Sequence, residues 1–154
     1  MWYYSFVNDS HSHLGGTLMA NEKNYKKRDA ILSYLRQTHT HPSAEMVYGE
    51  VKSQIPDISL ATVYRNLATF RQRGDIVCIG TVNGMERYDG NTRPHVHFIC
   101  EGCYKVLDMP EISLSEQVYN QARSLYGCTA NYCNLTINGL CDECTAHQKG
   151  EHIA

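Results

Sequence analysis

The densest group of potential metal ligands lies in the stretch PHVHFICEGC, residues 94–103, which contains His95, His97, Cys100 and Cys103. Imidazoles and thiolates are the usual ligands of zinc, and four of them complete a tetrahedral site. Successive side chains of a β-strand point to opposite faces, so His95 and His97 share one face while Cys100 lies on the other. The spacing therefore predicts that this stretch contributes to two metal sites.

The first predicted site is a structural zinc site with four cysteine ligands. Cys100-x-x-Cys103 is followed by a second pair, Cys141-x-x-Cys144. The tight turn of such a pair directs both thiolates to one point. Four cysteines would leave no open coordination position, so the zinc is expected to stabilise the second half of the chain. A redox-active dithiol and a chance pairing are the alternatives that the spacing leaves open.

The second predicted site uses the two histidines that the cysteine site does not need. Its further candidate ligands are His41, Asp89 and Asp108. Three imidazoles and two carboxylates suit Fe²⁺, Mn²⁺ or Zn²⁺. Because His41 precedes the predicted junction and His95 and His97 follow it, a shared ion would fix the angle between two domains and could switch their activity. The alternative is that both strand histidines are exposed or packed in a core.

The first part of the chain has the pattern of a winged helix. Helices are predicted at 24–38, 41–54 and 59–74, followed by a β-hairpin at 75–90. Ser59 is a good N-cap and Gly74 a good helix stop for the third helix. Asn83-Gly84 is a strong signal for a hairpin turn. Helices followed by a hairpin in this order are typical of DNA-binding domains.

The third helix places its apolar residues on one face and small or polar residues on the other, which suits a DNA major groove. Basic residues at the start of the first helix would contact phosphates. An ordinary solvated helix face is the alternative. The predicted DNA-binding residues are Lys27, Arg28, Ala61, Thr62, Tyr64 and Arg65.

The second part of the chain predicts a smaller α/β domain, which makes the whole chain α+β. Short strands are predicted at 95–100 and 104–109, a helix at 111–127 and a strand within 128–141. The helix is amphipathic, and its apolar residues are expected to point mostly inward: Ile112, Val118, Ala122 and Leu125.

Three segments follow from these patterns. Residues 1–18 form an N-terminal extension in which we expect partial disorder. Residues 19–90 form the winged-helix domain, and residues 91–154 form the metal-binding domain.

Composition excludes several classes of protein. The 154 residues are 42% hydrophobic with a formal net charge of -2, as in an ordinary globular protein. The sequence contains neither a membrane-length apolar run nor a secretory signal, so we expect a cytoplasmic protein without a membrane partner. Seven cysteines in such a chain favour metal or redox chemistry over disulfides. The sequence shows no paired general base, no nucleophile and no phosphate-binding loop, so we do not expect an enzyme. A metalloenzyme and a zinc-stabilised protein-interaction module remain competing hypotheses.

Five motifs occur in the order HPSAEMVY, ISLATVYRNLATF, ERYD, HVHFICEGC and GLCDEC. Together, from about Asn24 to Cys144, they resemble the ferric uptake regulator (Fur) superfamily of metal-dependent transcription factors. The resemblance implies a winged-helix domain, a hinge near residues 89–94 and a C-terminal α/β dimerisation domain. It also implies a homodimer that represses transcription from a palindromic operator in double-stranded DNA. The chain departs from the family in having Tyr104, where a glycine usually follows the second cysteine.

Asp89 distinguishes the branches of this superfamily, since iron sensors usually have Glu there, whereas peroxide-sensing regulators (PerR) resemble this chain. The resemblance to that branch implies structural Zn²⁺ and a regulatory Fe²⁺ or Mn²⁺. It also implies that hydrogen peroxide oxidises His41 or His95 in the Fe²⁺ form and releases DNA. Sensing of iron or zinc levels is the alternative within the superfamily. The implied regulatory ligands are His41, Asp89, His95, His97 and Asp108.

Overall fold

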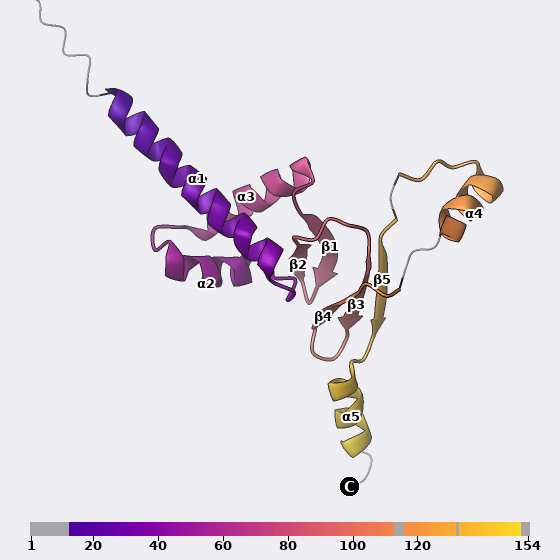
Figure 1. Cartoon of the computed structure of the whole chain (residues 1–154). Coiled ribbons are helices and arrows are strands. Elements are labelled where there is room, and N and C mark those ends of the chain that lie inside the picture. The colour runs from indigo at the N-terminus through magenta and orange to yellow at the C-terminus, as the bar shows by residue number, and fades with distance from the viewer. Residues whose placement is uncertain (1–12, 113–115, 132, 152–154) are drawn as a thin grey trace, which may run out of the picture.

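The elements of the chain form two groups, one of three helices with a hairpin and one built on a three-stranded sheet (Figure 1). The computed structural model describes residues 13–112, 116–131 and 133–151. In chain order the elements are α1 (His13–Gln37), α2 (Ala44–Gln54), α3 (Leu60–Arg73), β1 (Val77–Val82), β2 (Met85–Asp89), β3 (Val96–Cys100), β4 (Val106–Met109), α4 (Glu116–Tyr126), β5 (Leu135–Gly139) and α5 (Asp142–Glu151).

The caps of α2 and α3 lie where the sequence predicts them. The side chains of Ser43 and Ser59 each accept a hydrogen bond from a backbone N–H in the first turn of their helix. Gly74 ends α3 in the left-handed conformation, with φ of 74°. The prediction of the third helix is therefore confirmed, and local chemistry fixes where it begins and ends.

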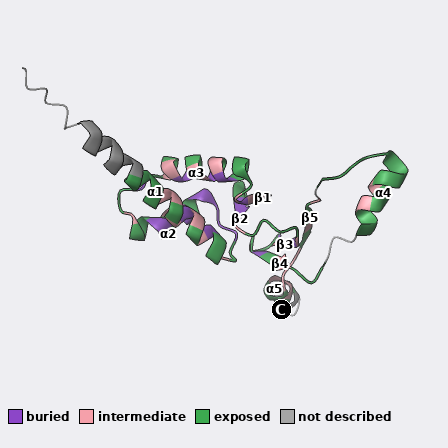
Figure 2. Ribbon diagram, turned by 45° about the horizontal axis from the view of Figure 1, so that its top comes forward, coloured by how far each residue is buried: buried purple, intermediate pink, exposed green. Residues whose placement is uncertain are grey.

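The core of the first group lies between α1, α2 and α3, whose buried faces turn toward one another (Figure 2). Val63, Leu67 and Phe70 of α3 are fully buried there. The hairpin of β1 and β2 follows directly, and its turn residues Asn83 and Gly84 both have positive φ, as a type I′ turn requires. This is the winged-helix order that the sequence predicts.

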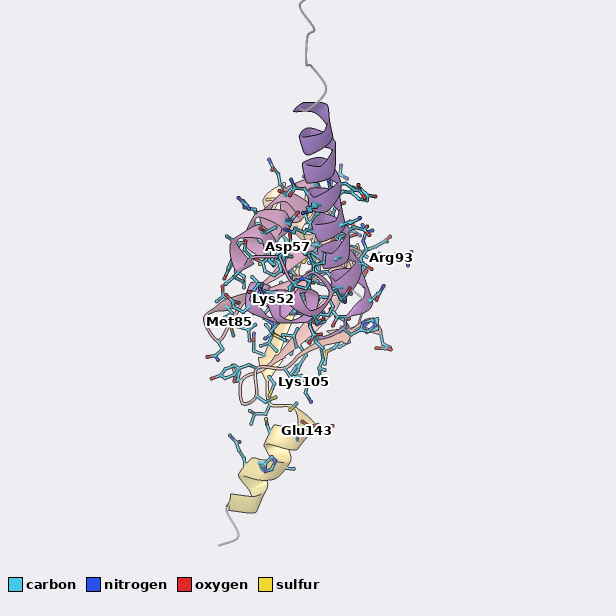
Figure 3. The ribbon with its side chains drawn as sticks, turned by 90° about the vertical axis from the view of Figure 1, so that its left-hand side faces the viewer. Lys52, Asp57, Met85, Arg93, Lys105 and Glu143 are labelled. Carbon is cyan, nitrogen blue, oxygen red and sulfur yellow. The ribbon has the colours of Figure 1, made fainter. Side chains whose placement is uncertain are left out.

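The second group is built on the sheet β4–β3–β5, in which β3 runs antiparallel to β4 and parallel to β5. The register places His97 opposite Asp108. A helix, α5, begins within the second cysteine pair and was not predicted from the sequence. Lys105, just before β4, lies near Glu143 of α5 (Figure 3), with 3.0 Å between Nζ and Oε2.

The apolar face of α4 is not buried, so the prediction that it points inward is wrong for the single chain. The exposed fractions are 46% for Val118 and 70% for Leu125, while Ile112 precedes the helix and is 43% exposed. The helix lies apart from the sheet in both views (Figures 1 and 2). Amphipathicity predicts which face of a helix seeks a partner, but no described element of the same chain covers this one.

The first helix is longer than predicted and begins at His13, inside the segment for which we expected partial disorder. Extending a helix adds one hydrogen bond for each residue ordered, so a helix nucleated in the core can propagate outward. Residues 1–12 of that segment lie outside the described residues. Among the described helices, none has the length and apolar content needed to cross a membrane.

Gly90, directly after β2, lies against the end of α1 and offers a test of how tightly the junction packs. A Cβ at this position would lie 2.3 Å from the carbonyl oxygen of Leu35, and backbone cannot move aside cheaply. We expect Gly90→Ala to lower the free energy of unfolding by about 1–3 kcal/mol. Gly49→Ala is the control, since a Cβ there meets nothing within 4 Å and should stabilise α2 by about 0.5–1 kcal/mol. Urea unfolding measures both, and equal effects would contradict the close packing.

Candidate metal centres

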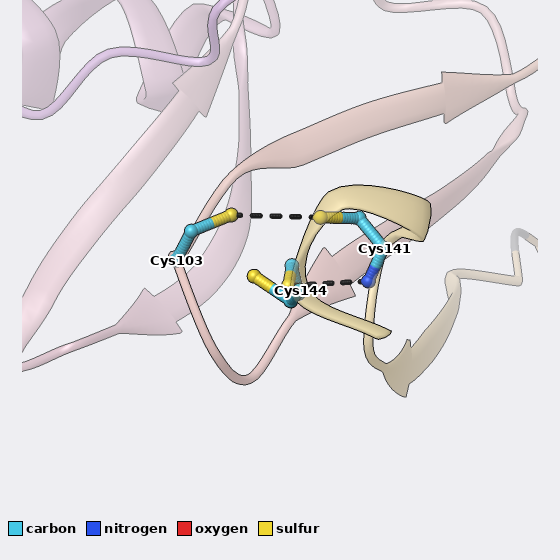
Figure 4. Close-up of side chains that lie close together, drawn as sticks. Cys103, Cys141 and Cys144 are labelled. Atoms are coloured by element: carbon cyan, nitrogen blue, oxygen red, sulfur yellow. Dashed lines mark hydrogen bonds between the residues drawn. The ribbon is translucent and has the colours of Figure 1, made fainter. Parts of the chain in front are cut away.

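The four predicted zinc ligands lie together at one end of the sheet, and Figure 4 labels three of them, Cys103, Cys141 and Cys144. Cys103 Sγ lies 3.8 Å from Cys141 Sγ, and the backbone N–H of Cys141 donates to Cys100 Sγ at 3.3 Å. The four cysteine Sγ atoms all lie within 4.8 Å of one another. Parallel pairing of β3 with β5 causes this, because Cys100 is opposite Gly139 and the second pair follows at once.

The ionisation of these thiols favours a bound cation. Hydrogen bonds from the backbone N–H groups of Cys103 and Cys141 lower the pKa of the Cys100 thiol to about 6. Hydrogen bonding raises the pKa of Cys144 to about 12, with the larger effect from Cys100 and a smaller one from Cys141. Thiolates this close repel one another. A divalent ion would remove that repulsion, and the donor set fits zinc.

The turn of the first cysteine pair explains how the chain accommodates Tyr104. This residue has φ of 60°, a left-handed conformation that glycine adopts more readily. Its N–H still donates to the Cys100 carbonyl at 2.9 Å, which closes the turn. Within the turn, a Cβ on Gly102 would lie 2.9 Å from Cys144 Sγ. The glycine that the cysteine cluster requires is therefore the one inside the pair.

The five residues of the second predicted site also lie together. His41 Nε2 is 2.7 Å and His95 Nε2 is 2.9 Å from Asp108 Oδ1. Asp89 Oδ2 lies 3.2 Å from His95 Nε2 and 3.3 Å from His97 Nε2. All three imidazoles thus direct Nε2 toward the same two carboxylates. Together, the imidazole nitrogens and carboxylate oxygens form a donor set suited to Fe²⁺, Mn²⁺ or Zn²⁺.

The residues that offer these five candidate ligand atoms come from both groups of elements. His41 lies in the loop between α1 and α2, and Asp89 ends β2. His95 and His97 lie just before and within β3, and Asp108 lies opposite His97 on β4. An ion held here would therefore connect the helical domain, the hairpin and the sheet.

The pKa values of His41 and Asp89 are shifted toward the forms that bind a cation, whereas that of His95 is raised, because its burial is outweighed by hydrogen bonds to the Arg93 carbonyl and Asp108. Burial lowers the pKa of His41, which favours neutral imidazole. Burial also disfavours ionised Asp89, but hydrogen bonds from His97 and the N–H of Asn91 outweigh it and lower the pKa of that carboxyl. Nδ1 of His41 is buried without a hydrogen-bond partner among the described residues, whereas its Nε2 faces Asp108. A buried histidine whose neutral form is favoured, beside an aspartate whose ionised form is favoured, fits a metal site.

Two features near this centre were missed by the sequence analysis. Arg87 is buried two residues before Asp89, and burial lowers the pKa of its guanidinium. The alternation of side chains along a strand is the signal that places it on the same face as Asp89. A cavity of about 480 Å³ also reaches the centre, where Asp89, His95 and His97 line it. Small polar molecules therefore have a path to these residues.

The predicted DNA-binding residues lie on α1 and α3. Ala61, Tyr64 and Arg65 are exposed. Arg28 lies over the Phe70 ring, 5.6 Å from its centroid, and lines a cavity of about 460 Å³ with Thr62 and Arg65. Two of the six residues, Lys27 and Tyr64, contact carboxylates within the protein.

Lys27 Nζ is 2.8 Å from Asp57 Oδ2. The hydroxyl of Tyr64 donates to Glu45 Oε1. These two side chains would have to exchange or share their partners to contact DNA.

The chain is similar to known proteins in both sequence and structure. The model of the ferric uptake regulator family matches residues 20–138. The peroxide-responsive repressor PerR of Staphylococcus aureus (strain USA300) is 36% identical over 118 residues, which cover 77% of this chain and 79% of the repressor.

Among solved structures, the Campylobacter jejuni peroxide stress regulator superposes with a TM-score of 0.73 at 29% identity, covering 86% of this chain and 99% of that protein. The Helicobacter pylori ferric uptake regulator Fur, described as having three functional metal-binding sites, has a TM-score of 0.67 at 25% identity. That match covers 92% of this chain and 97% of Fur.

Proposed function

Because this chain belongs to the ferric uptake regulator family, we propose that it is a homodimeric repressor whose DNA binding depends on a metal at the histidine/aspartate centre. We further propose that the centre holds Fe²⁺ or Mn²⁺ and responds to hydrogen peroxide, while the four cysteines hold a structural Zn²⁺. The domain boundary lies between the hairpin and the sheet, near residue 90.

The observation that carries this proposal is that the five candidate ligands come from two different parts of the fold. His41 comes from the helical domain, whereas His95, His97 and Asp108 come from the sheet, and Asp89 lies at the junction. An ion that binds all five stabilises one arrangement of the two domains over others by its differential affinity. In a dimer this arrangement sets the distance between two recognition helices, which must match the spacing of two half-sites on DNA.

Peroxide is favoured as the signal by three features. The relatives named above include two peroxide regulators. The carboxylate at the end of β2 is an aspartate, Asp89, and the cavity at Asp89, His95 and His97 admits a small polar molecule. Bound Fe²⁺ would supply the redox chemistry for peroxide reduction. A histidine that gains one oxygen atom, with release of one water, balances the reduction of one hydrogen peroxide, and His41 and His95 are the candidates.

Dimerisation is supported by the apolar surface of the second domain. Val118 and Leu125 of α4 are exposed, as are Leu135 and Ile137 of β5. Such residues on one domain favour burial against a second copy. The six residues on α1 and α3 would then read each half of a palindromic operator.

The test measures binding to a duplex that the Mn²⁺-loaded protein selects from a random library. We expect tight binding with Mn²⁺ or with anaerobic Fe²⁺, and weak binding without either. Hydrogen peroxide should abolish binding of the Fe²⁺ form only, and peptides with His41 or His95 should gain the mass of one oxygen atom. If the Fe²⁺ form keeps its affinity after peroxide and gains no oxygen, the peroxide proposal is wrong. Restoration by Zn²⁺ alone would identify a zinc-level sensor.

A further inference from the structure

Arg87 is a buried cation whose partners are all backbone carbonyls. It is 7% exposed and forms no ion pair among the described residues. Its Nη2 donates to the Thr40 carbonyl at 3.0 Å, its Nε donates to the His41 carbonyl, and its Nη1 reaches the Tyr104 carbonyl at 3.5 Å. A buried charge without a counter-ion is costly, so these contacts must compensate its loss of solvation.

The guanidinium holds two backbones in an uncommon conformation. His41 has φ of 50° and Tyr104 has φ of 60°. A residue other than glycine stays in the left-handed region when the surrounding structure determines it. The N–H of Tyr88 also donates to the Pro42 carbonyl at 3.1 Å. Two consecutive residues of β2 therefore bind three consecutive carbonyls of the loop that presents the His41 ring.

The imidazole of His41 is not oriented in the way that is usual for a metal ligand. A ligating histidine usually donates its second ring N–H to a nearby acceptor, which fixes the ring. His95 follows this rule, since its Nδ1 lies 2.7 Å from the Arg93 carbonyl. The Nδ1 atoms of His41 and His97 have no such partner among the described residues, but the backbone of His97 is fixed by its pairing in the sheet, whereas His41 lies in a loop. The contacts from β2 therefore restrain His41 through its backbone rather than through Nδ1.

We propose that Arg87 is a positioning residue for the histidine/aspartate centre: it fixes the backbone of His41 so that Nε2 faces Asp89 and Asp108. Through Tyr104 the same guanidinium connects His41 to the turn of the four-cysteine cluster. β2 then has two roles, because it supplies Asp89 as a ligand and sets the position of another. The inference rests on the proposed function only in requiring that the centre binds a divalent cation.

The test compares Arg87→Lys with wild-type protein in the full-length dimer, without DNA or peroxide. Lysine keeps the charge but cannot reach three carbonyls with a planar fork. Mn²⁺ affinity is measured by competition with a chelator. We expect the Kd for Mn²⁺ to rise about 10- to 100-fold, the range for loss of a group that orients a ligand. Zinc content and the helical circular dichroism should stay unchanged. Arg73→Lys, at the exposed end of α3, is the matched control and should bind Mn²⁺ like wild type.

A second variant separates positioning of His41 from other roles. If Arg87 acts through His41, then Arg87→Lys should weaken Mn²⁺ binding much less in a His41→Ala background than in wild type. An equal weakening in both backgrounds would overturn the proposal.

The remaining outcomes are also decisive. Wild-type protein that binds no Mn²⁺ or Fe²⁺ would refute the proposed function. Wild-type binding with an unchanged Arg87→Lys would refute only the role of Arg87. Loss of zinc or of helical signal in Arg87→Lys would assign Arg87 to general stability and overturn the proposal as well.

Discussion

Replacing Cys141 with serine is expected to release the zinc, unfold the second domain and dissociate the dimer. The second domain has a small core, with the buried cluster of Ile79, Val82 and Val106 at its edge and no buried residue in α4. Structural zinc contributes on the order of 10 kcal/mol to folding in small metal-binding domains. That contribution is as large as the net stability of a typical domain, about 5–15 kcal/mol. Elemental analysis of zinc and analytical ultracentrifugation measure the two effects.

The control for this variant is Cys128→Ser. Cys128 is exposed and outside the cluster, so its replacement should leave one zinc per chain and an intact dimer. If Cys141→Ser kept its zinc and its dimeric mass, the four cysteines would not form a structural site. A redox-active dithiol, the alternative from the sequence, would instead leave the fold intact in the serine variant.

Replacing His41 with alanine is expected to abolish the metal-dependent gain in DNA affinity while leaving the zinc in place. His41 is the only one of the five clustered candidate ligands that lies in the α1–α2 loop, so its loss removes the contact of the helices with the ion and leaves only Asp89 from the winged-helix domain. Loss of a group that merely orients a ligand weakens metal binding about 10- to 100-fold, and loss of the ligand itself should cost at least as much. Mn²⁺ titration and operator binding at fixed salt measure the change.

His39→Ala is the matched control, because His39 lies in the same loop but is 88% exposed, with Nδ1 3.7 Å from Asp108 Oδ2. This variant should bind Mn²⁺ and the operator like wild type. If His41→Ala bound the operator with unchanged dependence on Mn²⁺, the ion would not act by joining the two domains. The interdomain mechanism would then fail even if the centre still bound the metal.

Several predictions from the sequence depend on local patterns, and these agree with the structure. Ser59 and Gly74 bound α3 because their side-chain and backbone preferences act within a single turn. Asn83-Gly84 determines the hairpin for the same reason. The assignment of His97 and Cys100 to different clusters follows from alternation along β3. The gathering of ligands was inferred with help from family motifs, since spacing along a chain does not determine distance in space.

The sequence by itself determined the kinds of candidate ligand, their division between two clusters and the caps of α3, because each depends on residues within a few positions of one another. Tertiary structure alone decided how His41 is held, since Arg87 contacts residues 46 and 47 positions away in the chain. It also decided that α4 leaves its apolar face uncovered. An amphipathic pattern records a preference for burial, whereas the burial itself depends on whether another surface lies within reach.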